Sequence, residues 1–337
     1  MGNKIKDYIY GEFEIDDVLI ELINCNAVQR LKNIHQVGAT YLVNKDLNVT
    51  RFEHSVGVML LIKMLGGSLK EQIAGLLHDV SHTAFSHVID FALDNNEQDY
   101  HEIIFNEVVI NSEIPDILKR YGYNYKYILK RYGYNYKDIL MDEKKWTILE
   151  RKAPKLCADR VDYTLRDMYK YGYTNKSEVD LFIKDICIVN GEIVVKSIDK
   201  ANWFLDLYYK EVVDFFMSPI NAYAYDRLAK AIKLAINTNE LHIKDILKTD
   251  NEVIEILKKS KNNDLLNLVN SLNDDIKIRI NENKYDIHIK GKLRLIDPSV
   301  YINNKVFALS DLDYNVNEIN NKVKDIINKG VYVEIIE

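Results

Sequence analysis

Five of the eight histidines of this 337-residue chain lie between residues 51 and 101. They are His54, His78, His82, His87 and His101. Neutral imidazoles and carboxylates are the side chains that bind Zn, Fe, Mn and Ni, and a metal-assisted hydrolase needs several of them around one ion, with a position left for water. A carboxylate, Asp79, directly follows His78, so the stretch predicts a metal site. The pair alone would not suffice, because a lone histidine beside an apolar run is more often a core residue.

Helices are expected to bring these side chains together. His54 begins an apolar run that predicts one helix, and residues 71–77 predict a second helix ending at His78 and Asp79. A fourth ligand has to come from a distant segment, and we expect it from a helix over residues 143–172. On that helix the spacing i, i+3, i+4, i+7 and i+8 places five side chains on one face, namely Asp159, Asp162, Tyr163, Arg166 and Asp167.

Six blocks of sequence, taken in order, resemble the HD-domain phosphohydrolases. They are KIKDYIYGEFEID, VQRLKNIHQVGATYLV, RFEHSVGV, LLHDVSHTAFSHVID, the following His-Glu, and ADRVDYTLRD. Within that family they resemble the dNTP triphosphohydrolases, in the branch that includes the animal SAM-and-HD-domain enzyme, and the resemblance spans residues 1–235. It implies that one divalent transition metal (Fe, Mn, Zn or Ni) is bound by His54, His78, Asp79 and Asp159. Mg on the substrate phosphates is a further option.

The resemblance also implies a set of catalytic residues next to the metal, which are His82, His87, Asp90 and His101. A carboxylate beside a histidine raises the pKa of the imidazole and fixes its tautomer, so Asp90 is expected to prepare a histidine for proton transfer near neutral pH. Two residues depart from the family pattern HDxGHxPFSH, because Ser81 replaces Gly and Ala84 replaces Pro. Both changes lie in the loop between metal ligand and acid, where they could alter rate or substrate.

Contacts to a dNTP follow from the same resemblance, with attack at the α-phosphorus releasing deoxynucleoside and inorganic triphosphate. The implied contacts are Gln36, Val37, Arg51, Arg160, Tyr163, Asp167 and one of Tyr223 or Tyr225. Simpler explanations stay open for some of them. Gln36 and Val37 are equally consistent with a helix end closed by Gly38, and Arg51 with a surface ion pair.

Two other functions stay open. One is an HD phosphohydrolase acting on nucleoside monophosphates, cyclic nucleotides or guanosine tetraphosphate. The other is a nucleotide- or nucleic-acid-binding regulator with a vestigial site, suggested by a repeat of ILKRYGYNYK at 117–126 and 128–137 within an insertion over residues 116–140. Its Lys-Arg-Tyr clusters are typical of weak single-stranded nucleic acid binding, and equally of a solvated flap. The complete ligand set favours an enzyme.

A nucleotide effector is a further option. Asn24 stands where the animal enzyme has an acidic residue that reads guanine. An amide cannot accept both guanine hydrogen bonds as a carboxylate does. GTP is therefore not expected to be an obligatory activator.

Composition predicts a folded chain, with 47% hydrophobic and 28% charged residues. The net charge of −6 gives no general attraction to nucleic acid or anionic lipid. The three cysteines form no disulfide framework, and no apolar run reaches the ~20 residues of a membrane span, so a cytoplasmic protein without a membrane segment is expected.

The expected fold is mainly α. An HD-domain helical bundle should occupy residues 1–240, with a small β-hairpin turning at Asn190-Gly191. Residues 241–337 should form a small α+β C-terminal lobe that serves packing or oligomerisation. A homo-oligomer, dimer or tetramer, is expected.

Overall fold

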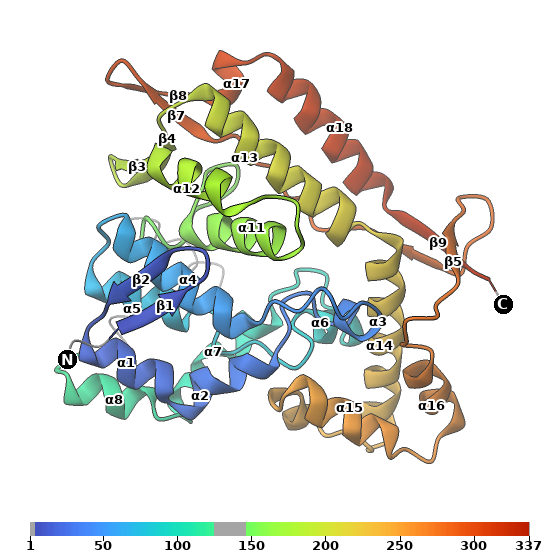
Figure 1. The fold of residues 1–337 in the computed structure, drawn as a ribbon. Coiled ribbons are helices and arrows are strands. Elements are labelled where there is room, and N and C mark those ends of the chain that lie inside the picture. The colour runs from blue at the N-terminus through green and yellow to red at the C-terminus, as the bar shows by residue number, and fades with distance from the viewer. Residues whose placement is uncertain (1–3, 125–145, 337) are drawn as a thin grey trace.

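The computed structural model describes residues 4–124 and 146–336 (Figure 1). The N-terminal part holds the hairpin β1 (Lys4–Asp7) and β2 (Gly11–Glu14), followed by α1 (Asp17–Asn24), α2 (Asn26–Gln29), the 3-10 turn η1 (Arg30–Asn33), α3 (Thr40–Val43), α4 (Arg51–Met64), α5 (Leu69–Leu77), α6 (Val88–Ala92), α7 (Tyr100–Ile110) and α8 (Ile114–Arg120). The middle part holds α11 (Ala158–Lys170), α12 (Lys176–Asp185), β3 (Ile186–Val189), β4 (Glu192–Val195), α13 (Ile198–Lys210), the π-helix η2 (Glu211–Phe216) and α14 (Pro219–Asn237).

The C-terminal part mixes short helices and strands. It holds η3 (Ile243–Leu247), α15 (Asp250–Lys258), α16 (Asn263–Asn270), β5 (Ile278–Ile280), β6 (Ile287–Ile289), β7 (Ser299–Ile302), β8 (Lys305–Ala308), α17 (Leu309–Leu312), α18 (Asn315–Lys329) and β9 (Val331–Ile335). The expectation of a mainly α fold with small β elements is confirmed.

Helix α4 lies at the centre of the bundle. It begins at Thr50, whose hydroxyl accepts from the backbone N–H of Glu53 while the Glu53 carboxylate accepts from that of Thr50, which fixes the first turn. Residues 54–62 are all buried, because α4 packs against α5 and α11 on different sides. The helix therefore presents polar side chains such as His54 to the interior rather than to water.

Helix α11 is shorter than the sequence pattern predicted. Residues 146–157 are turns and extended chain, and the helix begins only at Ala158. Pro154 explains the late start, because proline lacks a backbone N–H and disfavours helical geometry in the residue before it. Its end is as expected, with Gly172 at a φ of +79° just beyond Lys170.

The predicted Asn-Gly hairpin is confirmed. Asn190 and Gly191 have φ values of +51° and +74°, as a two-residue hairpin turn requires, and β3 pairs antiparallel with β4. Strand β7 continues this sheet by parallel pairing with β4, so the order is β3-β4-β7-β8. A second small sheet has the order β5-β9-β6. Because β4 and β7 share one sheet across the expected boundary at residue 240, a separate C-terminal lobe stays a prediction.

Two hydrophobic clusters hold the elements together. The larger one surrounds α4, α5, α11 and α13, and the other lies between α14, α6, α15 and α16. Helix α14 contributes to both and also contacts β6 and β9, so it links the bundle to the C-terminal elements (Figure 1). Within the described ranges, no helix has the length and apolar character to cross a bilayer. The second copy of the tandem repeat lies outside the described residues.

Candidate metal centre and active site

The four expected ligands come together between α4, the end of α5 and the start of α11. Nε2 of His54 lies 3.0 Å from Oδ1 of Asp159 and 3.7 Å from Oδ2 of Asp79. Nε2 of His78 lies 3.4 Å from Oδ1 of Asp79 and 3.5 Å from Oδ1 of Asp159. Two imidazole nitrogens thus face two carboxylates at distances that one divalent ion could bridge.

The outer nitrogens of both histidines are held by the fold. Nδ1 of His78 donates to the carbonyl oxygen of Gly75 (2.7 Å), which leaves Nε2 unprotonated, with its lone pair available to a metal ion. That Nε2 is buried and has no hydrogen-bond partner in the described part of the chain. Nδ1 of His54 lies 2.9 Å from a carboxylate oxygen of Asp162, which likewise directs Nε2 to the cluster. The residues present therefore fit a divalent transition metal.

A buried ion-pair chain orients His54 from behind. Arg166 is fully buried, donates to both carboxylate oxygens of Asp162, and also pairs with Asp7 of β1 at 2.9 Å. Gly57 makes this arrangement possible. A Cβ at position 57 would lie 2.0 Å from the Arg166 guanidinium and 2.1 Å from Asp162.

Arg51 is an internal residue rather than part of a surface ion pair. Its guanidinium donates to Oδ2 of Asp79 (2.6 Å) and to the hydroxyl of Ser86 (3.1 Å). Because Arg51 pairs with Asp79, a candidate metal ligand, its positive charge is already partly neutralised inside the protein. It still lines the cavity described below.

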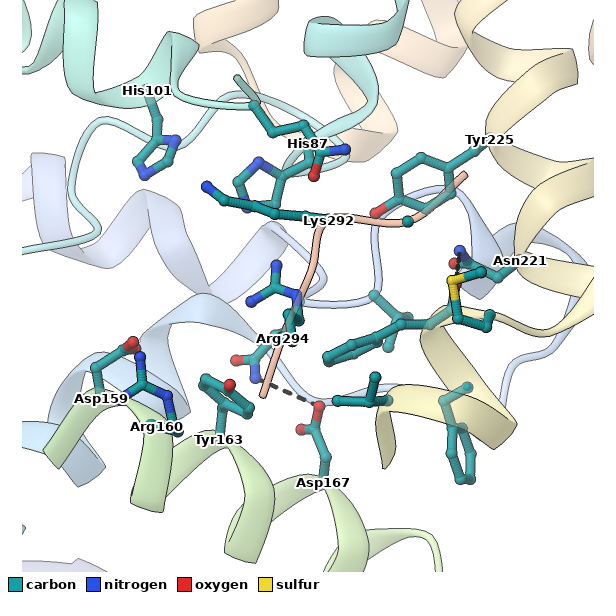
Figure 2. Close-up of a pocket in the computed structure, with 18 of the residues that line it drawn as sticks. His87, His101, Asp159, Arg160, Tyr163, Asp167, Asn221, Tyr225, Lys292 and Arg294 are labelled. Carbon is teal, nitrogen blue, oxygen red and sulfur yellow. Dashed lines mark hydrogen bonds between the residues drawn. The ribbon is translucent and has the colours of Figure 1, made fainter. Parts of the chain in front are cut away.

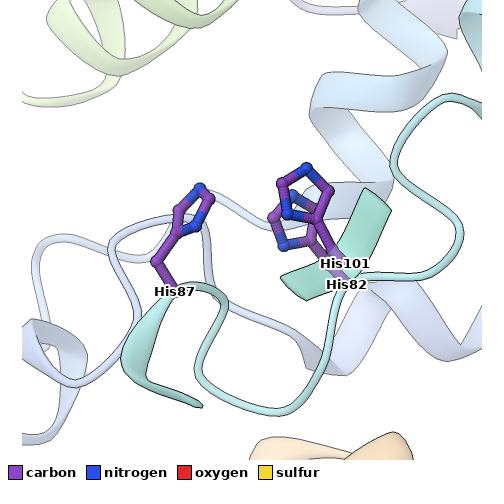
Figure 3. Close-up of side chains that lie close together, drawn as sticks. All are labelled: His82, His87 and His101. Carbon is purple, nitrogen blue, oxygen red and sulfur yellow. The ribbon is translucent and has the colours of Figure 1, made fainter. Parts of the chain in front are cut away.

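The expected catalytic histidines form a second cluster next to the first (Figure 3). The rings of His82 and His101 stack at 4.0 Å, and His87 meets both edge-on at 5.0 and 5.2 Å. Their ligand atoms lie within 4.8 Å of one another. Nε2 of His82 lies 3.3 Å from Oδ1 of Asp79 and so joins the two clusters.

Asp90 and Ser81 fix this histidine cluster. A carboxylate oxygen of Asp90 lies 3.1 Å from Nδ1 of His87, and the other accepts from Asn95 and from the backbone of Tyr100. Ser81, at a family glycine position, donates its hydroxyl to the carbonyl oxygen of His101 (2.7 Å). This departure from the family pattern therefore anchors a catalytic candidate.

Burial changes the expected proton chemistry. It lowers the pKa of His87 below its ordinary value, and the neighbouring Asp90 only partly offsets that effect. Burial and the nearby Arg51 charge lower the pKa of His82 well below its ordinary value. Both rings are therefore neutral at neutral pH: Asp90 raises the pKa of His87 as expected, but burial outweighs it.

One cavity of about 780 Å³ contains both clusters. Its lining includes nearly all of the expected substrate contacts, namely Gln36, Val37, Arg51, Arg160, Tyr163, Asp167 and Tyr225 (Figure 2). Tyr223 is not among them, since its hydroxyl donates to the carbonyl of Ser271. Gly38, which turns at a φ of +59°, brings its backbone to the Tyr225 hydroxyl, where a Cβ would come within 2.8 Å.

Two buried carboxyl groups interact at one side of the cavity, and of the two Asp167 lines it. The Gln36 amide donates to Asp167 (3.3 Å), and Glu211 of the π-helix η2 interacts with Asp167. Burial raises the pKa of Asp167 to about 7. It also raises that of Glu211 well above its usual range, with the Asp167 charge as the next cause. The sequence pattern did not single out Glu211.

The sequence analysis also missed a cationic segment from the C-terminal part. Residues 289–294, which connect β6 to β7, line the cavity with Lys290, Lys292 and Arg294. Their Lys-Gly-Lys-Leu-Arg sequence has alternating cations in an extended segment, a signal for a phosphate-facing edge that could have been noticed. Asn24, proposed to influence effector choice, is exposed and donates its amide to the carbonyl of Ile20.

With the two clusters in one cavity of this helical fold, comparison with known proteins is informative. A family model described as HD domain matches residues 51–166. The chain belongs to the HD-domain family of metal-dependent phosphohydrolases.

Individual relatives support this assignment. The chain is 48% identical to the uncharacterized protein YdhJ of Bacillus subtilis, with 99% of both covered. It is 32% identical to the metal-dependent phosphohydrolase cns2 of Cordyceps militaris, over 77% of this chain and 74% of that protein. Human deoxynucleoside triphosphate triphosphohydrolase SAMHD1 is 28% identical over 58% of this chain, which matches 38% of the human protein. A hypothetical protein from Aquifex aeolicus shares the fold, with a TM-score of 0.69, 22% identity, and 96% and 99% coverage.

Proposed function

We propose that this protein hydrolyses deoxynucleoside triphosphates to deoxynucleoside and inorganic triphosphate. The observation that carries the proposal is that the four-ligand cluster and the cluster of His82, His87 and His101 share one cavity with the polar side chains of Gln36, Asp167 and Tyr225. A volume of about 780 Å³ is within the usual range for a small-molecule site. Similarity to proteins named deoxynucleoside triphosphate triphosphohydrolase supports the choice of substrate.

Metal and histidines would divide the reaction between them. A divalent ion held by His54, His78, Asp79 and Asp159 would polarise a phosphoryl oxygen and lower the pKa of water. The reaction would form a bond between a water oxygen and the α-phosphorus and break the bond from that phosphorus to the 5′-oxygen. The leaving 5′-oxygen then needs a proton. His87 and His101 are the proposed donors, since a bound polyphosphate favours their protonated forms despite burial.

Sugar choice would depend on the far side of the cavity. Gln36 and Asp167, which share a hydrogen bond, would contact a 3′-hydroxyl. Val37 and Tyr225 would leave no room for a 2′-hydroxyl. A site that bonds one hydroxyl and excludes its neighbour can discriminate strongly, so dNTPs should be preferred over NTPs.

Product analysis tests the proposal directly. Protein loaded with Mn²⁺, Fe²⁺, Zn²⁺ or Ni²⁺ is incubated with each dNTP and NTP, and the products are separated by chromatography. Deoxynucleoside and triphosphate as the products are expected. Equal hydrolysis of ATP and dATP would contradict the sugar assignment, and turnover only of monophosphates or cyclic nucleotides would indicate another HD phosphohydrolase activity.

Several properties of the protein in the cell belong to the same proposal. We propose that the protein is a cytoplasmic homo-oligomer. We also propose that it does not require GTP as an activator, because Asn24 lacks the second acceptor oxygen of a carboxylate. Initial rates on one dNTP with and without GTP test this. Activity that depends entirely on GTP would contradict it.

A further inference from the structure

The segment 290–294 crosses the active-site cavity although it comes from the C-terminal part of the chain. Figure 2 shows Lys292 and Arg294 on this segment, which has no regular secondary structure, within the same cavity as His87, Asp159 and Tyr163. Nζ of Lys292 donates to the carbonyl oxygen of Glu97, in the loop before α7 (3.3 Å). The segment therefore closes the cavity against the HD-domain helices.

Both ends of the segment are fixed. Ile289 pairs with Val331 in the sheet of β6 and β9. At the other end Ile296 is fully buried, donates to the Tyr209 hydroxyl (3.1 Å) and accepts from it (3.3 Å). Gly291 packs so closely on Met217 that a Cβ would lie 2.4 Å from its sulfur. The segment is thus held in place before a ligand binds, which lowers the entropic cost of binding.

Arg294 carries a charge that no hydrogen-bonded carboxylate neutralises in the described part of the chain, although the Asp159 carboxylate acts on it electrostatically. No carboxylate or carbonyl oxygen among residues 4–124 and 146–336 accepts a hydrogen bond from its guanidinium, which lies 5.3 Å over the ring of Phe216. Burial works against this charge, but Tyr163 and Tyr208 keep the pKa of Arg294 above its usual value. The side chain is therefore a permanent cation inside a cavity, where an unpaired charge is costly.

A second guanidinium lies in the same region. Arg160 lines the cavity and donates to the carbonyl oxygen of Lys155 (2.5 Å) and to the sulfur of Cys157 (3.2 Å). Neither partner cancels its charge, and Arg160 and Arg294 repel each other. Arg51 differs from both, because it pairs with Asp79. Neither guanidinium has a hydrogen-bonded carboxylate among the described residues, although Asp159 acts on Arg294 and Glu150 on Arg160 at longer range. Two such cations in one cavity favour an anion between them.

We propose that Arg294, together with Lys292, binds the phosphate chain of the substrate, so that the C-terminal part of the protein completes the active site. The inference rests on the proposed function and narrows its substrate class. The metal-ligand cluster takes the phosphate that reacts, whereas Arg294 and Arg160 take the phosphates beyond it through charge-assisted hydrogen bonds. A nucleoside monophosphate has no group for these cations, so triphosphates are the favoured substrates.

Two probes separate phosphate binding from nucleoside binding. Sodium tripolyphosphate and deoxyadenosine are each titrated calorimetrically into Mn²⁺-loaded wild-type, Arg294→Gln and Arg279→Gln proteins. Arg279 is the matched control, since it is in the same C-terminal part on β5 and pairs with Glu334, which Lys284 and Asn281 also hold. Removal of metal by tripolyphosphate would affect both variants equally. For Arg294→Gln we expect tripolyphosphate affinity to fall by about 10- to 100-fold, with deoxyadenosine affinity and metal content unchanged.

The same variants are then assayed with dNTPs. Loss of tripolyphosphate affinity specific to Arg294→Gln supports the inference, even if no dNTP is hydrolysed and the proposed function fails. Wild-type hydrolysis of dNTPs with less than a twofold change in tripolyphosphate affinity for Arg294→Gln overturns the inference and leaves the proposed function standing. A loss of deoxyadenosine affinity instead would mean that Arg294 contacts the nucleoside, which also overturns it.

Discussion

The imidazole of His78 uses one nitrogen for the fold and leaves the other for a ligand. Its Nδ1 is bonded to the backbone of α5, and its buried Nε2 faces two carboxylates. A buried imidazole nitrogen with no partner costs free energy unless something binds it. We expect a metal ion to bind this nitrogen of His78, and also Nε2 of His54, which lies 3.0 Å from Oδ1 of Asp159.

Removing a ligand should therefore release the metal. In His78→Ala and Asp159→Ala proteins we expect metal content to fall well below one ion per chain, because the three remaining groups bind more weakly. His242→Ala is the control, since His242 is remote and caps η3. Elemental analysis after dialysis measures the content. Full stoichiometric metal in both ligand variants would show that the ion binds elsewhere.

The histidine cluster should affect turnover without affecting metal content. Replacing His87 by Ala should lower kcat by about 10²- to 10⁴-fold, the usual effect of losing a general acid or base. Asp90→Asn should give a smaller loss, because it changes only the orientation and charge environment of the ring. Kinetics on the best dNTP, paired with elemental analysis, test this. Near-wild-type turnover in His82→Ala, His87→Ala, Asp90→Asn and His101→Ala together would remove the assignment.

Asp167 should make stability depend on pH in an unusual direction. Burial raises its pKa to about 7 in the folded protein, so the folded state binds more protons than the unfolded state above about pH 4. Stability contributed by this group is therefore present at low pH and is lost as pH rises through about 7. Asp167→Asn should raise Tm relative to wild type at about pH 8 and have little effect at about pH 5. Thermal unfolding across pH measures this, and a larger gain at acid pH would contradict it.

At the scale of elements, the spacing of apolar residues was sufficient to predict a helix where capping residues also marked its ends. The helices α4 and α5 and the Asn-Gly hairpin follow from local sequence, because capping residues and turn residues act within a few positions. The predicted start of α11 was wrong, because Pro154 disfavours a helix where the polar periodicity of the segment predicted one. Strands β7 and β8 were missed, because their pairing with β4 is a long-range contact.

The same distinction applies to the site. The family resemblance identified the histidines and carboxylates, which lie in continuous motifs. It left Tyr223 and Tyr225 unresolved, because neighbouring helix positions point in directions that only packing decides. Glu211 had no such motif, since its chemistry depends on burial beside Asp167, which is distant in sequence. The alternating cations that end at Arg294 were visible in the sequence, but their place in the cavity was not.

Gly57 is the element-scale feature most sensitive to substitution. Gly57→Ala would place a methyl group against the Arg166 and Asp162 pair, so α4 and α11 must separate. We expect a stability loss of about 1–3 kcal/mol together with weaker metal binding, because Asp162 no longer orients His54. Gly67→Ala is the control, since its Cβ would meet Ile62 away from the ligands. It should lose stability but keep its metal. Denaturant unfolding and metal titration of both variants decide, and equal metal affinity would contradict the prediction.

At the scale of the whole molecule, Asp250 ties the C-terminal part to the catalytic loop. It lies at the start of α15 and is 2% exposed. Its carboxylate accepts from the backbone N–H of Phe85 (2.6 Å) and of His35 (2.9 Å), and contacts Nδ1 of His35 (2.8 Å). Gln36, a proposed sugar contact, directly follows His35, and His87, a proposed acid, lies two residues after Phe85.

The loop that Asp250 holds is strained. Phe85 and Ser86 have φ values of +58° and +53°, and a side chain in this region costs about 1–3 kcal/mol unless surrounding contacts impose it. Ser86 is held by Arg51 and by the carbonyl of His35. Asp250 supplies the remaining bond at Phe85. The position of His87 thus depends on a residue that is distant from it in sequence.

Asp250→Ala should therefore lower both stability and turnover while leaving metal in place. Each buried N–H left without a partner costs about 1–3 kcal/mol, and relaxation of the loop would move His87 away from its cluster. Glu252→Ala is the matched control, because it removes a carboxylate from the same first turn that accepts hydrogen bonds from the backbone and hydroxyl of Thr249. We expect that variant to lose about 1 kcal/mol and keep its activity.

Denaturant unfolding, kcat on a dNTP and elemental analysis are measured for both. If Asp250→Ala lost stability but kept wild-type kcat, the loop would hold His87 without help from the C-terminal part. If it lost metal as well, Asp250 would instead support the metal ligands.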